Sequence, residues 1–327
     1  MAKAEEIVGL DCEAHALAGV ALVLRTRFME MYAFREAALD WSDPKGVHDM
    51  RVASRRLRSA MGDFAPYLRG RLPRKRLRQL ADALGAVRDE DVALAALEEL
   101  THEAETEADY ATDLRAIHTT RCARRDDARA LLALALEASA LDALREKFLR
   151  KLAHAASAPD DSGVDQARGR DTPAPTFKQM GRVIILARLD DLIARSRALQ
   201  QPHNVKRLHD LRIAAKRLRY ALELFAPCWG EQLQTQADEV AMLQKALGDL
   251  HDCDVWIDEL GALLEQTRVK KDDLTTETIA TLAAERKATF QLLSHFTKER
   301  TEHFRAALAC WADWEATFFF ARLREVL

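Results

Sequence analysis

The sequence is poor in the residues that build turns and strands. Its 327 residues include only 12 Gly and 8 Pro, and runs of β-branched residues are scarce, whereas Ala, Leu, Arg and Glu dominate. These four residues favour helices, and 48% hydrophobic residues are enough for a sizeable core, so we expect a largely helical globular protein. No stretch matches GxxxxGK[ST] or GxGxxG, which excludes the usual glycine-rich loops that hold nucleotide phosphates.

Long apolar runs and paired cysteines are also missing. No apolar run approaches the roughly 20 residues that span a bilayer, and the N-terminus lacks the basic start and apolar core of a signal peptide. Because the cysteines show no close spacing, a zinc site is disfavoured, and we expect buried free thiols in a reducing compartment. The five are Cys12, Cys122, Cys228, Cys253 and Cys310. We therefore expect a cytoplasmic protein with no membrane partner.

The charges are strongly segregated, although the net charge is only −3. From Lys45 to Arg88 there are 12 Lys and Arg against 3 Asp and Glu, and from Asp89 to His118 there are 10 acidic residues against 1 basic. A basic surface followed directly by an acidic one is the main feature that a function must explain.

One basic segment occurs twice. VHDMRVASRRLRSAMGDFAPYL, from Val47, and LHDLRIAAKRLRYALELFAPCW, from Leu208, are identical at 11 of 22 positions. A second pair follows in the same order, ALGAVRDEDV from Ala83 and ALGDLHDCDV from Ala246. Two related segments in the same order indicate an internal duplication.

A single linker-like stretch divides the chain. Residues 155–176 are rich in Pro, Ser, Asp and Gly without helical periodicity, and they separate residues 1–154 from residues 177–327. Each half contains one copy of the repeat. We therefore predict an all-α fold of two similar bundles, about four helices each, related by a pseudo-twofold axis.

The expected helices follow from hydrophobic periodicity and proline positions. First helices are expected over 4–38 and 177–199, and the two basic helices are expected to end at Pro66 and Pro227. SDPKG and QPHN, which precede the basic helices, place a proline where a helix can begin. Third helices are expected from near Pro73 and Glu231, and the patterns over 101–154 and 274–327 are helical with internal breaks.

Each basic helix is expected to carry a stripe of cationic side chains. At 100° per residue, four of them fall within an arc of about 80° and extend for about 15 Å. They are His48, Arg51, Arg55 and Arg58 in the first copy and His209, Arg212, Lys216 and Arg219 in the second. The opposite side of the first helix is apolar and is the expected core face, with Met50, Ala53, Leu57, Ala60, Met61 and Phe64.

One cation per helical turn suits a linear polyanion better than a single phosphate. The arginine fork matches phosphate oxygens, whereas lysine supplies a point charge. The stripes lack the aromatic platforms on which nucleic-acid bases stack, since only Tyr220 lies near one. Two stripes facing each other would line a groove that reads the backbone of a phosphate polymer.

The doubled HDxRxxxxRxR helix ending in FAP, with the later LGxxxDxDV, resembles the CHAD domain, the conserved histidine α-helical domain, over essentially the whole chain. The resemblance implies two four-helix halves around a basic cavity, binding of inorganic polyphosphate, and association with polyphosphate granules and their proteins. Many members also carry an N-terminal triphosphate-tunnel domain with an ExExK signature, which is absent here, so the chain resembles a stand-alone form. The ligands that the resemblance implies are His48, Arg51, Arg55, Arg56, Arg58, His209, Arg212, Lys216, Arg217 and Arg219.

Further basic residues extend this prediction. Arg88 and His251 occupy equivalent places in the second repeated segment and are candidates for the same groove. Arg74, Lys75 and Arg78 would widen it, although the second half has no equivalent run. The acidic clusters of that segment, Asp89 to Asp91 with Asp252 and Asp254, are expected to form buried salt bridges to the basic helices rather than to hold Mg²⁺.

Other functions stay open at this stage. The His-Asp pairs invite comparison with metal-dependent HD phosphohydrolases, but the flanking arginines would oppose a cation. RNA or DNA would also bind a basic groove through its phosphates, and a granule scaffold would use the acidic surface. We expect a binding protein rather than an enzyme, without catalytic residues, metal, cofactor or specific nucleic acid. The long helices that close each half leave a homo-oligomer open.

Overall fold

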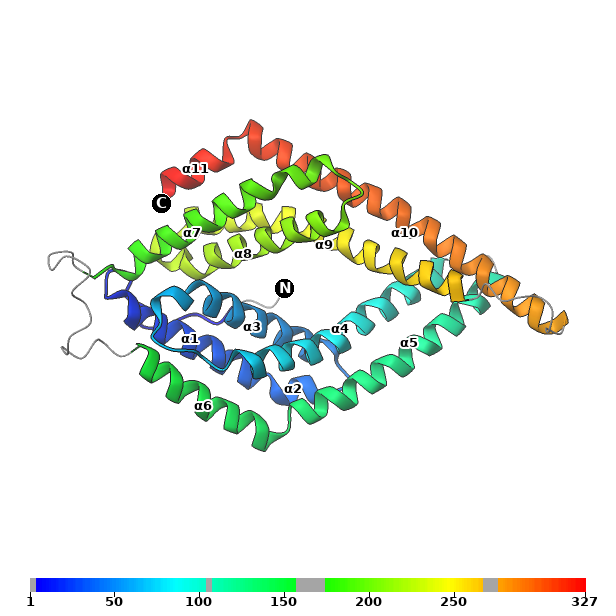
Figure 1. Cartoon of the computed structure of the whole chain (residues 1–327), viewed down its shortest axis with the longest axis horizontal. Helices are drawn as coiled ribbons and strands as arrows, with labels where there is room; N and C mark the ends of the chain where they lie inside the picture. The colour runs from blue at the N-terminus through cyan, green and yellow to red at the C-terminus, as the bar shows by residue number, and fades with distance from the viewer. Residues whose placement is uncertain (1–3, 104–107, 157–173, 267–275) are drawn as a thin grey trace. The chain divides into compact units, whose positions relative to one another are not determined.

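The computed structural model describes residues 4–103, 108–156, 174–266 and 276–327 (Figure 1). Within these ranges all regular secondary structure is helical, and His15 with Thr176 forms one isolated bridge rather than a strand. The predicted all-α class is therefore confirmed. In the same ranges, no helix combines the length and the apolar character that a membrane crossing requires.

The helices follow the order expected from the sequence. Those before the predicted linker are α1 (Ala16–Ala33), α2 (Arg35–Leu39), α3 (Pro44–Asp63), the 3₁₀ turn η1 (Ala65–Tyr67), α4 (Arg74–Glu103), α5 (Ala108–Ala135) and α6 (Ala138–Ala156). Those after it are α7 (Phe177–Arg195), η2 (Ser196–Gln200), α8 (Val205–Trp229), α9 (Glu231–Gln266), α10 (Thr276–Ala316) and α11 (Phe319–Val326). The first helix, predicted over 4–38, differs from this prediction in two ways. Residues 4–15 are not helical, and the rest is divided at Phe34 into α1 and α2.

The chain forms two compact units that are not consecutive in sequence. Unit 1 consists of Met1–Ala93, Cys122–Leu186 and Glu223–Gly230, and unit 2 consists of Leu94–Arg121, Ala187–Leu222 and Glu231–Leu327. The helices α4, α5, α7 and α8 each continue from one unit into the other. Most of the predicted linker lies outside the described residues, so the division into sequence halves and their pseudo-twofold relation stay predictions.

In unit 1, α1 packs against α3 and against α6 (Figure 1). Phe28 of α1 stacks on Phe148 of α6 with ring centroids 4.3 Å apart, and both rings are fully buried. The helix α2 lies close to α3 because residue 46 is glycine: a Cβ there would lie 1.8 Å from the carbonyl oxygen of Ala37. Any larger residue would therefore push α2 away from the start of the basic helix.

The phenylalanines of the two FAP motifs meet in the core of unit 1. Phe64, after α3, and Phe225, near the end of α8, contact each other edge to face with centroids 6.1 Å apart, and Phe177 packs 4.9 Å from Phe225. Gly19 and Gly181 make room for these rings, since a Cβ at either would lie less than 3 Å from a ring carbon. Each repeated motif thus anchors the C-terminal end of its basic helix.

The two basic helices end differently, and one predicted end is wrong. The helix α3 ends at Asp63, shortly before the predicted end at Pro66, whereas α8 contains Pro227 and continues to Trp229. A proline removes one backbone donor and costs stability, but here it lies in the last turn. Gly230, at φ +73°, ends the helix instead, and α9 begins at Glu231 as predicted.

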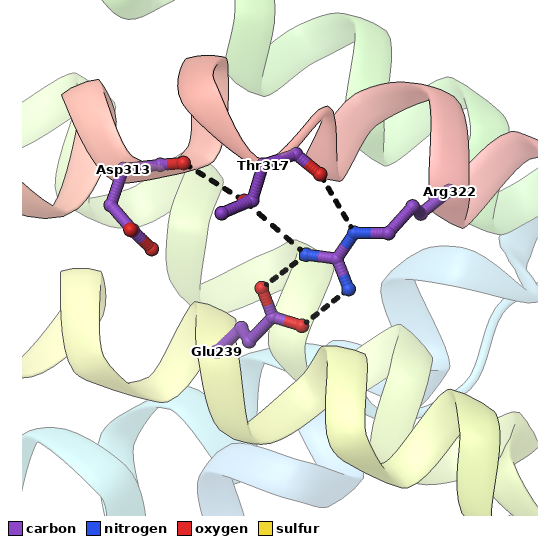
Figure 2. Close-up of polar contacts among 4 residues, drawn as sticks. All are labelled: Glu239, Asp313, Thr317 and Arg322. Carbon is purple, nitrogen blue, oxygen red and sulfur yellow. Dashed lines mark hydrogen bonds and ion pairs between the residues drawn. The ribbon is translucent and has the colours of Figure 1, made fainter.

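In unit 2, α9 lies along α10 (Figure 1). The helix α11 follows a bend at the end of α10 and contacts α9. Arg322 of α11 donates two hydrogen bonds to the carboxylate of Glu239 on α9, at 3.2 and 2.8 Å (Figure 2). Its Nε donates to the carbonyl oxygen of Thr317, whose hydroxyl donates to the carbonyl oxygen of Asp313. One guanidinium therefore joins the last helix to α9 and to the turn between α10 and α11.

Two of the cysteines are paired, contrary to the sequence prediction. Cys12 and Cys228 form a disulfide, although 216 positions separate them. Sequence spacing could not reveal this pair, because the fold brings the N-terminal segment to the end of α8. Because disulfides are rare in reducing compartments, the pair also argues against the reducing compartment that we expected from the sequence. Cys122, Cys253 and Cys310 are free thiols.

Replacing Cys12 and Cys228 together by serine is expected to lower the free energy of unfolding by about 2–4 kcal/mol, because the cross-link closes a very long loop in the unfolded chain. Urea unfolding without reductant measures the change. Cys310→Ser is the control, since that half-buried thiol is free. An unchanged unfolding midpoint in the double variant, or free thiols at both positions in the purified protein, would contradict the disulfide.

Candidate functional site

The basic helix of unit 1 has the two faces that its sequence predicts. Its six predicted core residues are at most 2% exposed, while the opposite face carries the stripe. His48, Arg51 and Arg55 are half-buried and Arg58 is exposed. Neighbouring side chains therefore cover part of the first three stripe residues, and Arg58, the last one, lies in solvent.

The stripe of unit 1 contacts the following helix, α4. A guanidinium nitrogen of Arg51 lies 3.0 Å from a carboxylate oxygen of Asp89. Gly85, one turn earlier on α4, lies under the same side chain, since a Cβ there would be 3.9 Å from Arg51 Nε. Arg51 thus lies across α4, held by an exposed carboxylate. The acidic cluster and the basic helix thus form a salt bridge as predicted, but it is exposed rather than buried.

Positive charges surround His48. Burial, together with the nearby guanidinium groups of Arg88 and Arg55, lowers the pKa of His48 below its ordinary value of 6.5, although Asp49 opposes this. The predicted additional residue Arg88 therefore lies beside the stripe, where its charge acts on the same imidazole.

Unit 2 has a corresponding cluster. The rings of His209 on α8 and His251 on α9 lie with centroids 4.7 Å apart. Burial, followed by the charge of Arg212, lowers the pKa of both imidazoles, for His251 to about 4. Lys216 acts in the same direction on both. His251 therefore joins the stripe of α8 as Arg88 joins that of α3.

Two predicted ligands need correction. Arg56 is buried and lies 3.7 Å from Glu30 of α1, which also accepts a hydrogen bond from Arg27, so it belongs to a buried ion-pair group. Arg219 is only 2% exposed, unlike its counterpart Arg58. Neither position can present its charge to a polymer in solution as Arg58 can. Arg217 is exposed but lies off the stripe.

The stripe histidines do not cap their helices, because other residues occupy the two helix starts. The helix α3 begins at Pro44, and Asp43 caps it by accepting a hydrogen bond from the Lys45 amide. Before α8, Asn204 accepts from the amide of Arg207. His48 and His209 therefore lie one turn inside their helices, where their side chains join the stripe.

The buried acids of the second repeat have partners that the sequence did not reveal. Asp91 lies 3.8 Å from Arg129 of α5, and Asp254 lies 2.6 Å from Arg300 of α10. The prediction that these two acids pair with the basic helices is therefore wrong, because each turns toward a later helix. Arg300 also donates to the carbonyl oxygen of Pro202, which holds the segment that leads into α8.

These ion pairs are buried inside the units and are largely inaccessible to solvent. Both carboxylate side chains are about 6% exposed. Burial raises the pKa of Asp91, although Arg129, Arg125 and Arg88 act against this rise. Removing one partner from such a pair is costly, since a buried charge is left behind. The acids therefore stabilise the frame that carries the stripes.

The remaining predicted basic residues divide into two groups. Arg74 and Lys75 line an open cavity of unit 1 at the start of α4. Arg78 lies outside that lining and is 3.7 Å from Asp82, with both side chains exposed. In the part of the chain that the structure describes, no group of three or more His, Cys, Asp or Glu side chains has an arrangement that could hold a metal ion.

Comparison with known proteins identifies the family. The CHAD domain profile matches residues 22–261, which include both stripes and both acidic clusters. The chain belongs to the CHAD family. A crystal structure of the CHAD domain from the plant Ricinus communis superimposes with a TM-score of 0.71 at 22% identity, covering 93% of this chain and 94% of that one.

A second similar structure is PptA from Streptomyces chartreusis, with a TM-score of 0.62 at 16% identity, covering 91% of this chain and 100% of the other. At such identities the likeness establishes the fold alone. No curated protein matches the chain. The CHAD match ends within α9, so Arg300, the partner of Asp254, lies beyond it.

The lowered histidine pKa values predict proton uptake when an anion binds. In the free protein, protonating these imidazoles is disfavoured, so the free energy of unfolding should fall as the pH falls below 6.5. A phosphate polymer on the stripes would favour the charged imidazoles and raise their pKa, so its affinity should increase as the pH falls below neutrality.

NMR titration of the imidazole ring protons tests this expectation. The midpoint of His251 should lie near pH 4 in the free protein, and long-chain polyphosphate should raise the midpoints of His48, His209 and His251. His15, which lies outside both stripes, serves as the reference signal. Ordinary midpoints near 6.5 in the free protein, or midpoints that the polymer leaves unmoved, would contradict this electrostatic description.

Proposed function

We propose that this CHAD protein binds inorganic polyphosphate through its two cationic stripes. One observation carries the proposal: each unit presents His, Arg and Arg or Lys at one-turn intervals on a basic helix, joined by a fourth group from the next helix. That group is Arg88 in unit 1 and His251 in unit 2. Membership of the CHAD family supports the same ligand.

The chemistry of the stripes suits a phosphate backbone. Charges at intervals of about 5.4 Å along a helix can follow a chain that carries one charge on every repeating unit. Both stripes lack an exposed aromatic ring for base stacking, and the neighbouring Tyr220 is only 5% exposed. These features favour a ligand that the protein recognises by its charge over a nucleic acid that is recognised by its bases.

We propose binding without hydrolysis. An HD-type phosphohydrolase binds cations through clustered His and Asp side chains, but here the neighbours that act most strongly on the stripe histidines are arginines. Their charge opposes a metal ion and favours an anion. Burial, followed by the charge of these arginines, lowers the pKa of all three histidines.

Binding of polyphosphate also predicts where the protein is located in the cell. We propose that the protein associates with polyphosphate granules, because a protein that binds the polymer at two stripes would be retained wherever the polymer is concentrated. Granule proteins are then the expected partners. The arrangement of the two stripes in one groove and a homo-oligomer both stay predictions.

The double variant Arg51→Glu/Arg212→Glu tests the proposal. Each change removes a phosphate contact and adds a repelling charge, so affinity for long-chain polyphosphate should fall by at least about a hundredfold, at about 1.4 kcal/mol per tenfold. Isothermal titration calorimetry at constant salt measures it. The circular dichroism spectrum should not change, since both positions lie off the core face.

The matched control is Arg182→Glu/Arg305→Glu, which changes the net charge equally. Both of these arginines are exposed and lie outside the stripes, on α7 and α10. The control should lose no more than severalfold in affinity. Equal losses of affinity in the two double variants would mean that net charge alone determines binding. Normal binding by the stripe variant would exclude the stripes as the binding site.

A further inference from the structure

A second basic surface lies at the start of α4, away from the stripe. An open cavity of about 1110 Å³ lies between the loop before α4, the first turn of α4 and one face of α6. All of its lining residues belong to unit 1. From α3 only Met61 reaches it, which lies beyond the last stripe residue, so the cavity is separate from the stripe.

The charge of this cavity is entirely positive. Its charged lining residues are Arg71, Arg74, Lys75, Arg76, Lys147 and Lys151, and no carboxylate lines it. In the described part of the chain, none of the six forms an ion pair with an acid. Six cations around one cavity repel each other, and an anionic ligand would relieve that repulsion.

The walls of the cavity are fastened together. The amide of Arg69 donates to the carbonyl oxygen of Ala155 at 3.1 Å, and the ammonium group of Lys151 donates to the carbonyl oxygen of Arg71 at 3.3 Å. On the other side, Arg74 donates to the carbonyl oxygen of Met61 at 2.9 Å. These bonds hold the loop to α6 and to the end of α3, so the cavity is preformed.

The second half of the sequence has no equivalent loop. Between α3 and α4 lie η1 and residues 68–73, whereas only Gly230 separates α8 from α9. The basic run RGRLPRKR, from Arg69, therefore has no counterpart in EQLQTQADEV, from Glu231. Since the stripe recurs and this loop does not, the repeated polymer site does not account for the cavity.

We propose that the cavity is a second anion site, which takes a compact small molecule with several phosphate groups. Lys147 and Lys151 lie one turn apart on α6, and Arg74, Lys75 and Arg76 lie in the first turn of α4. All five side chains line the same cavity. Charges that converge from two helices fit a compact ligand better than a linear one. The volume of about 1110 Å³ is slightly above the roughly 300–1,000 Å³ of typical small-molecule sites. The positive end of the α4 dipole adds to the attraction.

Inorganic tripolyphosphate is the probe that tests this site. The variant Lys147→Gln/Lys151→Gln, on the exposed face of α6, should bind tripolyphosphate at least tenfold more weakly than the wild-type protein in calorimetry. The control Arg124→Gln/Arg150→Gln removes two charges from exposed side chains of α5 and α6 outside the lining and should bind normally. Thermal unfolding of all variants establishes that they fold.

Long-chain polyphosphate and the stripe variant Arg51→Glu/Arg212→Glu separate this site from the proposed function. The second site predicts that the cavity variant retains polymer binding and that the stripe variant retains tripolyphosphate binding. Unchanged tripolyphosphate affinity in the cavity variant, or equal losses in the control, would overturn the proposal. Loss of polymer binding in the cavity variant would also overturn it, because the cavity would then be part of the polymer site.

Discussion

The structure depends on one electrostatic constraint: a helix that buries one face completely and aligns like charges on the other. On α3 the core residues are at most 2% exposed, so the helix cannot rotate to separate its cations. Their mutual repulsion is a cost of the fold that an anion can relieve. Asp89 relieves it only in part, because its carboxylate pairs with Arg51 but is itself exposed to solvent.

The two units meet this constraint in related ways. In each, a histidine of the basic helix lies near a basic or imidazole group of the next helix, Arg88 or His251, and a buried aspartate of that helix pairs with an arginine farther along the chain. The ion pairs hold the frame, and the stripe remains available to a ligand. The two stripes differ at their last position, because packing buries Arg219 in unit 2, whereas Arg58 in unit 1 is exposed.

Much of this arrangement could be predicted from the sequence, because it depends on local periodicity. The core face of α3, its start at Pro44 and the grouping of Arg88 and His251 with the stripes all follow from spacing and repetition. Contacts between distant segments could not be predicted. The Cys12–Cys228 disulfide and the burial of Arg56 against Glu30 depend on how helices pack, and no periodicity encodes them.

The central claim is that the stripes select a phosphate polymer by its density of charge. The most direct measurement is binding of long-chain polyphosphate at several salt concentrations, with RNA as competitor. We predict that the affinity for polyphosphate falls by orders of magnitude between about 50 and 200 mM salt. We also predict that the polymer stays bound in an excess of RNA. Displacement by RNA at equal phosphate concentration would contradict it and would identify the stripes as a general polyanion site.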